Sequence, residues 1–323
     1  MARPFQVNTA LTAIAIGYRN PASAYIADAA MPRQAVSLEK FGWTEYPIEE
    51  AFNVPDGRVS RLGRVPQLEF GGVQREASVE DFGFDVPIPN SDIDTAAKAR
   101  EMGLGNFDPE AHAVASATDT LLNIREVRVA AMVQNPLNYS VGRRIQLAQA
   151  ADKFSDYANS DPIGVITRGL DSTLVMRPTD AFMGRDVWSK ISSHPKMVNA
   201  VKGNVTSQGR ITPEQFVEVF AGDGLQRLHI GDSFFNTAKP GQPVALSRAW
   251  GKSLALLHVN PLATPQMGGI TWGLTGQYGT RLAGRIVDED VGLQGGVRVR
   301  TGERVKELVV AKDVGYLIQD AVA

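Results

Sequence analysis

The chain has 323 residues, with 33 basic and 35 acidic side chains and a formal net charge of -2, so its charge favours neither nucleic acid nor anionic membranes. It contains no cysteine, which excludes disulfides and thiolate metal sites and fits a reducing compartment. The apolar stretch at residues 10–17 is too short to span a bilayer and makes a weak signal peptide. The 31 glycines and 18 prolines follow no repeat and predict many turns.

The first 35 residues are predicted to form an extended arm. Prolines and Asn-Pro steps interrupt every periodic segment, although residues 22–30 fit one short helix. Apolar residues of the arm, such as Ile14 and Ile26, need a surface to lie on. In an assembly that surface is often a neighbouring subunit.

Residues 42–88 are predicted to form a long hairpin. Its strands are expected at residues 43–52 and 65–73, on either side of the polar stretch 53–58. A two-stranded ribbon is marginal in water unless something packs against it. The hairpin therefore also needs a covering surface.

Two helices with clear start signals follow. Residues 91–94, Ser-Asp-Ile-Asp, resemble a capping box, and Gly103 is a natural stop. In the second helix, Asp108 supplies a cap acceptor and Pro109 suits the first helical position. Apolar residues then recur at three- and four-residue spacing until Pro136, with Arg125 among them, which predicts one helix of about 26 residues, on the order of 40 Å long.

Beyond Asn138 the pattern predicts short helices alternating with short strands, and thus an α+β chain without an internal repeat. Helices are expected at residues 141–158, 162–170, 182–192 and 212–220. Strands are expected at residues 173–177, 228–235, 244–250, 253–259, 269–278, 281–287, 297–300, 305–310 and 316–322.

Residues that could carry out catalysis or bind a metal are sparse. The four histidines, at positions 112, 194, 229 and 258, lie at no ligand spacing from one another and are expected to be structural. The sequence Gly251-Lys252-Ser253 lacks the upstream glycine of a phosphate loop, because Leu246 stands there, and residues 288–290 lack the glycine and glutamate that complete a calcium loop. We therefore expect no catalytic residues, no cofactor and no metal.

Three arginines, Arg58, Arg61 and Arg64, crowd the tip of the predicted hairpin. One interpretation is a solvated loop. A second is that the arginines pair with acids of a neighbouring subunit, since guanidinium groups suit bidentate contacts across interfaces. Nucleic-acid binding ranks third, because no aromatic side chains interleave with the arginines. The three residues are our candidate intersubunit contacts.

The order of these parts resembles the major capsid proteins of tailed bacteriophages, which have the Hong Kong 97-type shell fold. Five local likenesses occur in order and together cover nearly the whole chain. They are NPASAYIADAAMPR (20–33), EEAFNVPD (49–56), ASVEDFGFDVPIPN (77–90), RPTDAFMGRDVWSKISSHPKM (177–197) and the C-terminal stretch 295–322 with its VGYL (314–317).

The resemblance implies a division of the chain into five parts. They are an N-terminal arm (1–35), an extended hairpin loop with flanking strands (36–90), peripheral-domain helices including a long spine helix (91–137), an axial domain (138–280), and returning strands of both domains (281–323). It also implies assembly in the host bacterial cytoplasm into hexamers and pentamers of an icosahedral virion capsid around double-stranded DNA, which is bound without sequence specificity. Separate scaffolding, portal and cement or decoration proteins would be the other partners, and no membrane is implied.

Two departures from the family matter. Some relatives carry a scaffolding region before the arm that is cleaved off, whereas this chain starts at the arm, so we expect a separate scaffolding protein. Some relatives cross-link through a lysine of the extended loop, but residues 42–84 contain no lysine, which predicts a shell held by noncovalent contacts.

Two alternatives stay open. One is the shell protein of a bacterial encapsulin nanocompartment, which has the same fold but encloses an enzyme. The other is a soluble α+β enzyme whose site is unrecognised. A small cement protein that decorates another shell is disfavoured, because it would need neither the long helix nor the long hairpin.

Overall fold

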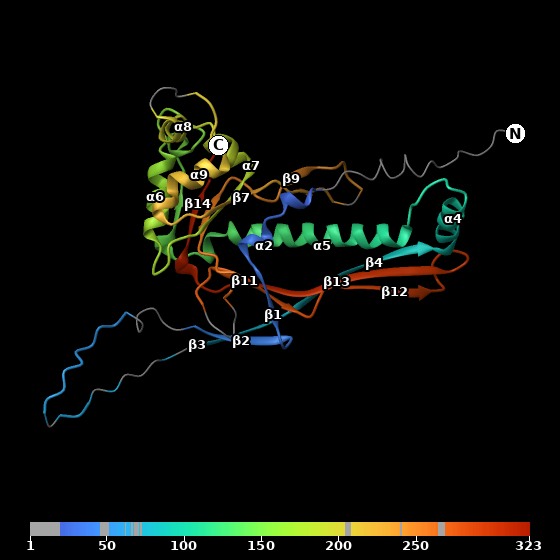
Figure 1. Ribbon diagram of the computed structural model, residues 1–323, viewed down its shortest axis with the longest axis horizontal. Helices are drawn as coiled ribbons and strands as arrows, with labels where there is room; N and C mark the ends of the chain where they lie inside the picture. The colour runs from blue at the N-terminus through green and yellow to red at the C-terminus, as the bar shows by residue number, and fades with distance from the viewer. Residues whose placement is uncertain are drawn as a thin grey trace.

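The computed structural model describes residues 20–45, 52–61, 63–65, 67, 71, 73–203, 208–239, 241–263 and 269–323. The molecule is elongated, with helix α5 (Pro109–Val133) along its long axis (Figure 1). A lobe of shorter helices and one sheet lies at the C-terminal end of α5, and a second sheet packs along the side of the helix. A hairpin projects from beneath that second sheet past the lobe.

Helix α5 begins where the sequence predicts. The Asp108 carboxylate accepts hydrogen bonds from the backbone N–H groups of Glu110 and Ala111, at 3.0 and 3.3 Å. Pro109 occupies the first helical position, where no N–H is needed. The helix has 25 residues, which confirms the predicted long helix.

Helix α4 (Asn90–Glu101) confirms the helix predicted before α5 but not its capping box. Pro89 is the N-cap residue, no side chain caps the helix, and Ser91 already lies inside the first turn. The chain enters α4 directly from strand β4 (Glu80–Pro89), so the strand sets the start of the helix. The end is the predicted one, because Gly103 has a φ of +67°, which glycine adopts readily.

The sheet beside α5 has five strands, in the order β1-β11-β13-β12, with β4 also paired to β13. The remaining bounds are β1 (Arg33–Val36), β11 (Gly273–Tyr278), β12 (Leu282–Asp288) and β13 (Gly296–Val309). The prediction of two strands within β13 is wrong. Strand β13 is unbroken because its ladder with β4 runs continuously from Gly296, opposite Pro89, to Val305, opposite Glu80.

The sheet inside the lobe has the order β5-β14-β10-β6-β7. Its strands are β5 (Arg144–Gln146), β6 (Asp180–Gly184), β7 (Arg227–Gly231), β10 (Leu254–Leu257) and β14 (Gly315–Gln319). The lobe helices are α6 (Pro162–Ser172), α7 (Arg185–Ile191), α8 (Pro195–Lys202) and α9 (Pro213–Phe220). The helices predicted at 162–170 and 212–220 and the strand at 253–259 are confirmed.

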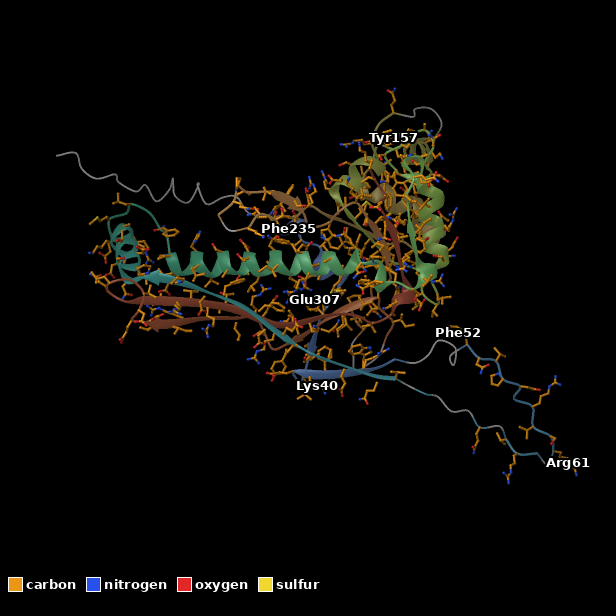
Figure 2. The ribbon with its side chains drawn as sticks, turned by 180° about the vertical axis from the view of Figure 1, so that it is seen from behind. Lys40, Phe52, Arg61, Tyr157, Phe235 and Glu307 are labelled. Atoms are coloured by element: carbon orange, nitrogen blue, oxygen red, sulfur yellow. The ribbon has the colours of Figure 1, made fainter. Side chains whose placement is uncertain are left out.

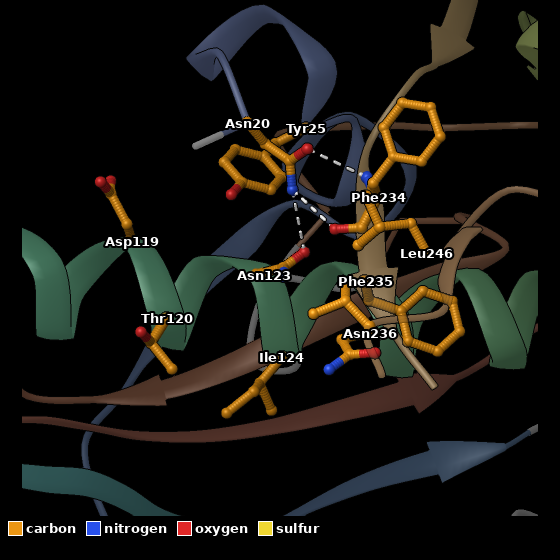
Figure 3. A pocket seen from close by; sticks show the side chains of 11 residues that line it. Asn20, Tyr25, Asp119, Thr120, Asn123, Ile124, Phe234, Phe235, Asn236 and Leu246 are labelled. Carbon is orange, nitrogen blue, oxygen red and sulfur yellow. Dashed lines mark hydrogen bonds between the residues drawn. The ribbon is translucent and has the colours of Figure 1, made fainter. Parts of the chain in front are cut away.

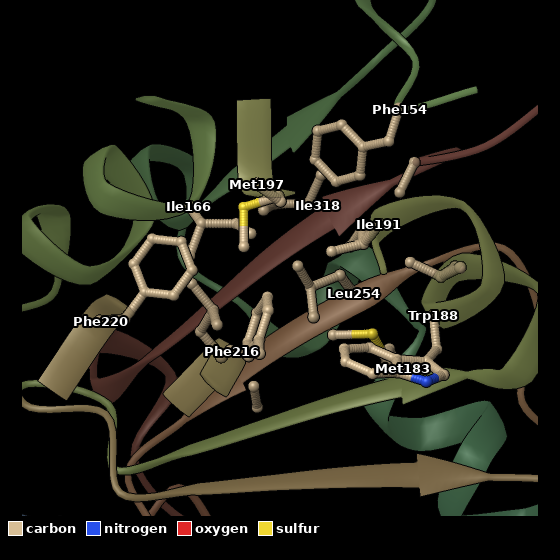
Figure 4. Packing of buried hydrophobic residues seen from close by; sticks show 14 of the residues in the cluster. Phe154, Ile166, Met183, Trp188, Ile191, Met197, Phe216, Phe220, Leu254 and Ile318 are labelled. Carbon is tan, nitrogen blue, oxygen red and sulfur yellow. The ribbon is translucent and has the colours of Figure 1, made fainter. Parts of the chain in front are cut away.

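The core of the lobe lies between this sheet and its helices (Figure 4). Phe216 of α9 packs edge-on against Trp188 of α7, with ring centroids 5.9 Å apart. Leu254 and Ile318, from adjacent strands, are fully buried against them. The short helices and the short strands thus bury each other's apolar faces, and neither set would be covered without the other.

No helix spans residues 141–158, contrary to the prediction. This stretch holds the 3₁₀ turns Val141–Arg143 and Ala150–Asp152, with strand β5 between them. Strand β5 pairs in parallel with β14, and the backbone N–H of Phe154 donates to the carbonyl of Ala321 at 2.8 Å. Pairing with the distant C-terminal strand therefore overrides the local helical pattern.

Residues 173–177 form no buried strand, also contrary to the prediction. Val175 is 56% exposed and has a φ of +67°, which an extended strand cannot accommodate. The buried strand is β6, which starts at Asp180. The first three residues of the helix predicted at 182–192 therefore belong to β6, and α7 starts only at Arg185.

Three other predicted elements are divided or shortened. Residues 22–30 form a 3₁₀ turn, Ala22–Ala24, and a separate helix α2 (Ala27–Ala30). The strand predicted at 228–235 is divided into β7 and β8 (Phe234–Asn236), and the strand predicted at 244–250 is shortened to β9 (Leu246–Arg248). Strands β8 and β9 form a small hairpin over α5 (Figure 3).

Candidate functional site

The long hairpin predicted from the sequence is present, and its strands are β2 (Lys40–Glu45) and β3 (Val73–Ser78), paired antiparallel. Strand β2 starts three residues before the first predicted strand (43–52), and β3 starts at Val73, where the second predicted strand (65–73) ends. Residues 46–51, where the first predicted strand continues, fall outside the described residues, and the described residues 52, 65, 67 and 71 are not in a strand.

The base of the hairpin rests on the sheet beside α5. Gly276 of β11 is buried, and a Cβ atom at this position would lie 2.5 Å from Cζ of Phe41, inside any allowed contact distance. Glycine is thus required for the Phe41 ring to approach the strand. Next to it, Arg304 of β13 pairs with Glu39 at 2.8 Å. These contacts set the direction in which the hairpin leaves the body.

We expect Gly276→Ala to push Phe41 off β11 and to lower the free energy of unfolding by about 1–3 kcal/mol, the usual cost of overpacking. Urea unfolding measures this change. Gly284→Ala is the matched control, because no atom lies within 4 Å of a Cβ at that position in β12. Equal losses in the two variants, or a Gly276→Ala loss that persists in a Phe41→Ala background, would contradict the contact.

The tip of the hairpin carries Arg58, Arg61 and Arg64, and all three side chains are exposed. Figure 2 shows Arg61 at the end farthest from the body. None of the three forms an ion pair with a described residue of the chain. Val54 and Val65 beside them are 92% and 74% exposed. The three predicted residues are therefore exposed in the same turn of the hairpin, without an ion pair to a described residue of this chain.

A buried carboxylate in α5 holds the segment before β1. Glu126 is fully buried and accepts hydrogen bonds from the backbone N–H groups of Ile26 and Ala27, at 2.8 and 2.9 Å, and from the indole N–H of Trp250, at 2.6 Å. Burial raises the pKa of Glu126, and these donors oppose the rise. The two backbone bonds start helix α2, which explains why residues 22–30 do not form a single helix.

Its neighbour Arg125 is also buried and faces the same segment. The guanidinium donates to the Asp28 carboxylate at 2.5 Å, and to the carbonyl of Met31 and the hydroxyl of Thr275, both at 3.1 Å. Arg125 thus connects α5 to both the segment after α2 and strand β11. The sequence does not predict this role, although an arginine at an apolar position of the helix is a signal that points to it.

Further ion pairs join the sheet to α5 and to β1. Glu303 of β13 is almost fully buried and binds Arg33 at 2.9 Å and Arg281 at 3.1 Å. Glu307 binds Arg128 of α5 at 2.7 Å. The spine of the molecule is therefore held by charged groups as well as by apolar packing.

The buried pair of Ser160 and His194 looks like a nucleophile with its base, but its hydrogen bonds run the wrong way. Nδ1 of His194 accepts the backbone N–H of Lys196, so Nε2 carries the proton and donates to Ser160 Oγ, 3.0 Å away. The Ser160 hydroxyl in turn donates to the carbonyl of Asp156. His194 therefore caps helix α8 and cannot take a proton from Ser160.

This pair predicts a pH dependence of stability. Burial lowers the pKa of His194, and Lys196 lowers it further against the opposing charge of Asp161. The unfolded chain therefore binds the proton of His194 more readily than the folded chain does. The contribution of neutral His194 to the free energy of unfolding is complete above about pH 6.5 and is lost as the pH falls toward the pKa of the folded state. We expect urea unfolding to show a smaller loss between pH 7.5 and 5.5 in His194→Asn, which retains a capping acceptor. An unchanged loss would contradict this assignment.

The other histidines have structural partners. His229 in β7 bonds the buried Asp180 at 2.8 Å, and His258, just after β10, lies 3.0 Å from the carbonyl of Arg177. His112 lies in the first turn of α5, beside the ring of Phe107. Among the described residues no three metal-binding side chains gather. No described helix is long and apolar enough to span a membrane.

The chain is similar over nearly its whole length to two phage proteins. It is 38% identical over 320 residues to the major capsid protein of Pseudomonas phage JBD67, covering 99% of this chain and 98% of that protein. It is 26% identical over 325 residues to the major capsid protein of Burkholderia phage BcepMu, covering 97% and 95%. No family model matches the chain.

Solved structures show the same fold. The capsid of cyanophage P-SCSP1u matches with a TM-score of 0.56 at 10% identity, over 94% of this chain and 89% of that one. An encapsulin from Synechococcus elongatus matches with a TM-score of 0.51 at 8% identity, over 90% and 85%, and is thus a more distant neighbour that shares only the fold. The fold is the Hong Kong 97-type shell fold, as the sequence predicted. With a relative at 38% identity along its full length, the chain belongs to the family of phage major capsid proteins.

Proposed function

We propose that copies of this chain assemble as hexamers and pentamers into an icosahedral virion capsid that encloses double-stranded DNA. The observation that carries the proposal is the 38% identity to a phage major capsid protein along the full chain. The exposed hairpin tip supports it, since apolar side chains such as Val54 and Val65 would be stabilised if a second copy covered them. Assembly would take place in the host cytoplasm, with separate scaffolding, portal and cement or decoration proteins.

The domains follow the same proposal. Residues 1–35 act as the arm, 36–90 as the extended loop, 91–137 as the peripheral helices with α5 as spine, 138–280 as the axial domain, and 281–323 as returning strands. The two sheets support the last assignment, because β13 lies beside α5 whereas β14 lies in the lobe. Strand β11 lies at the end of the range 138–280 but pairs with β13 in the sheet beside α5. We therefore propose to end the axial part before β11 instead of at residue 280.

Within the shell, Arg58, Arg61 and Arg64 pair with acidic side chains of a neighbouring subunit. Their exposure and their lack of ion pairs with described residues support this role over that of internal contacts. The absence of lysine between residues 42 and 84 supports noncovalent contacts at the tip. The role is structural and not catalytic, and the direction of the Ser160–His194 hydrogen bond supports that view.

Purification of the protein alone tests the assembly. Sedimentation and negative-stain microscopy are expected to find rings or closed shells that form above a threshold concentration. A stable monomer at high concentration, with hydrogen-exchange protection along β2 and β3, would contradict the proposal.

The contents of the particle separate a virion from an enzyme-loading nanocompartment. Particles from a phage lysate, treated with nuclease and then opened by heat, are expected to release double-stranded DNA. Release of a cargo enzyme without nucleic acid would favour the nanocompartment instead.

A further inference from the structure

The hairpin tip carries the sequence Asp56-Gly57, and the lobe carries the other Asp-Gly step of the chain, Asp223-Gly224. Glycine has no Cβ atom to hinder an approach to its backbone nitrogen. The carboxyl carbon of the aspartate before it can therefore reach that nitrogen and close a five-membered ring, if the backbone is free to turn. The two steps differ in this freedom.

Asp56 and Gly57 are both exposed and lie outside any helix or strand. The backbone N–H of Arg58 donates to Oδ1 of Asp56 at 3.1 Å, so the carboxyl group folds forward over the peptide unit of Gly57. No described atom lies within 4 Å of the point where a Cβ of Gly57 would stand, and the Gly57 N–H donates to no described acceptor. The carboxyl carbon is thus held beside a backbone nitrogen that is free to react.

The Asp-Gly step in the lobe is fixed by its surroundings. The Gly224 N–H donates to the carbonyl of Ala221 at 3.1 Å, at the end of the 3₁₀ turn Ala221–Asp223, and Gly224 has a φ of +102°. The Arg177 guanidinium donates to the main-chain carbonyl of Asp223 at 3.2 Å and lies 3.8 Å from its carboxylate. Here the nitrogen is already a donor and the carboxylate faces an arginine, so this step is an unreactive reference within the same chain.

We propose that Asp56-Gly57 is a site of spontaneous aspartate isomerisation in the free subunit. The backbone nitrogen of Gly57 attacks Cγ of Asp56, and a C–N bond forms. The C–O bond of the carboxyl group breaks, and its hydroxyl leaves as water with the proton of the nitrogen. A second water molecule then opens the succinimide ring. Attack at Cγ restores aspartate, whereas attack at the main-chain carbonyl carbon gives isoaspartate, and the mass of the chain is unchanged.

Isoaspartate changes the geometry of the hairpin tip. The main chain then runs through Cβ and Cγ of residue 56, which inserts one carbon atom, and the free carboxylate moves to the α-carbon. The N–H of Arg58 loses its side-chain acceptor, because Cγ has become a main-chain carbonyl group. The reaction therefore redirects the segment that carries Arg58, Arg61 and Arg64. It takes place within one subunit and does not depend on what that subunit assembles into.

Ageing of the purified, unassembled protein in neutral buffer tests the proposal. Trypsin releases the two Asp-Gly steps in separate peptides, residues 41–58 and 211–227, and liquid chromatography separates each peptide from its isomer of equal mass. An isoaspartyl methyltransferase with a labelled methyl donor identifies the isomer, because it methylates the carboxylate of isoaspartate and not that of aspartate. We expect isoaspartate to form about 100-fold faster at residue 56 than at residue 223, since misplaced reacting atoms cost a factor of this size in rate.

Gly57→Ala is the matched variant, because the tip has room for the added methyl group, which hinders the attack on Cγ. It should slow isomerisation at residue 56 about tenfold and leave thermal unfolding unchanged. A synthetic peptide of residues 52–61 gives the rate without the folded body, and the wild-type protein should match that rate closely. Equal rates at residues 56 and 223, equal rates in the wild type and Gly57→Ala, or a protein rate far below that of the peptide would overturn the proposal.

Discussion

Replacing Arg58, Arg61 and Arg64 together by glutamate is expected to abolish shell assembly while the subunit stays folded. The three side chains are exposed and form no ion pair with a described residue of their own chain. The substitutions should therefore change the free energy of unfolding of the subunit little. Across an interface, by contrast, each reversed charge would face an acid. The loss of a charge contact of this kind costs about 2–5 kcal/mol, and repulsion adds to it. Sedimentation velocity measures assembly, and thermal unfolding measures the fold.

The same three positions replaced by lysine provide the control. Lysine keeps the positive charge but not the bidentate geometry of arginine, so assembly should weaken without being lost. Shells that form normally from the triple glutamate variant at the same protein concentration would show that the tip is only a solvated loop.

Glu126→Ala is expected to cause the largest loss of stability of any single change considered for α5, about 3–5 kcal/mol. The substitution leaves the N–H groups of Ile26 and Ala27 and the indole N–H of Trp250 without their acceptor in a buried site. It also leaves Arg125 with one fewer negative neighbour. Urea unfolding gives the change in free energy, and hydrogen exchange at residues 26 and 27 shows where it acts.

Glu126→Gln separates the charge from the hydrogen bonds. The amide retains one accepting oxygen, so this variant should lose less stability than Glu126→Ala. If both variants unfold at the wild-type urea concentration, Glu126 does not anchor the segment before β1.

The parts of the fold that the sequence predicts well are those specified locally. Helix α5 has its cap acceptor and proline in adjacent positions and a periodic apolar face, so its start and length follow from a short stretch of chain. The same holds for α9, where Thr212 and Gln215 form a capping box. Prolines and glycines end these segments because of the conformations that their own backbone allows, without any distant partner.

The parts that it predicts poorly depend on distant partners. Strand β5 is a strand because β14 lies beside it, more than 150 residues later in the chain, and residues 141–158 carry no trace of that pairing. The described ladder of the hairpin, β2 with β3, lies where Phe41 meets Gly276, and the sequence of the hairpin alone does not reveal that contact. Short apolar runs such as residues 173–177 do not distinguish a strand from an exposed turn.

The candidate site divides in the same way. The sequence alone identifies the three arginines of the tip, because a cluster of like charges in a predicted turn can be found from their positions. Glu126 stays hidden, since its donors belong to residues about 100 positions earlier and 124 positions later in the chain. The difference between Asp56-Gly57 and Asp223-Gly224 also stays hidden in the sequence, because only the structure shows that the Gly224 N–H is already bonded.

Electron cryo-microscopy of the purified particle would show whether this chain builds the shell. We predict that this chain occupies every position of an icosahedral lattice, with each hairpin tip over a neighbouring subunit and its three arginines within hydrogen-bonding distance of acidic side chains there. A lattice built from another protein, or hairpin tips that point into solvent in every subunit, would contradict the account.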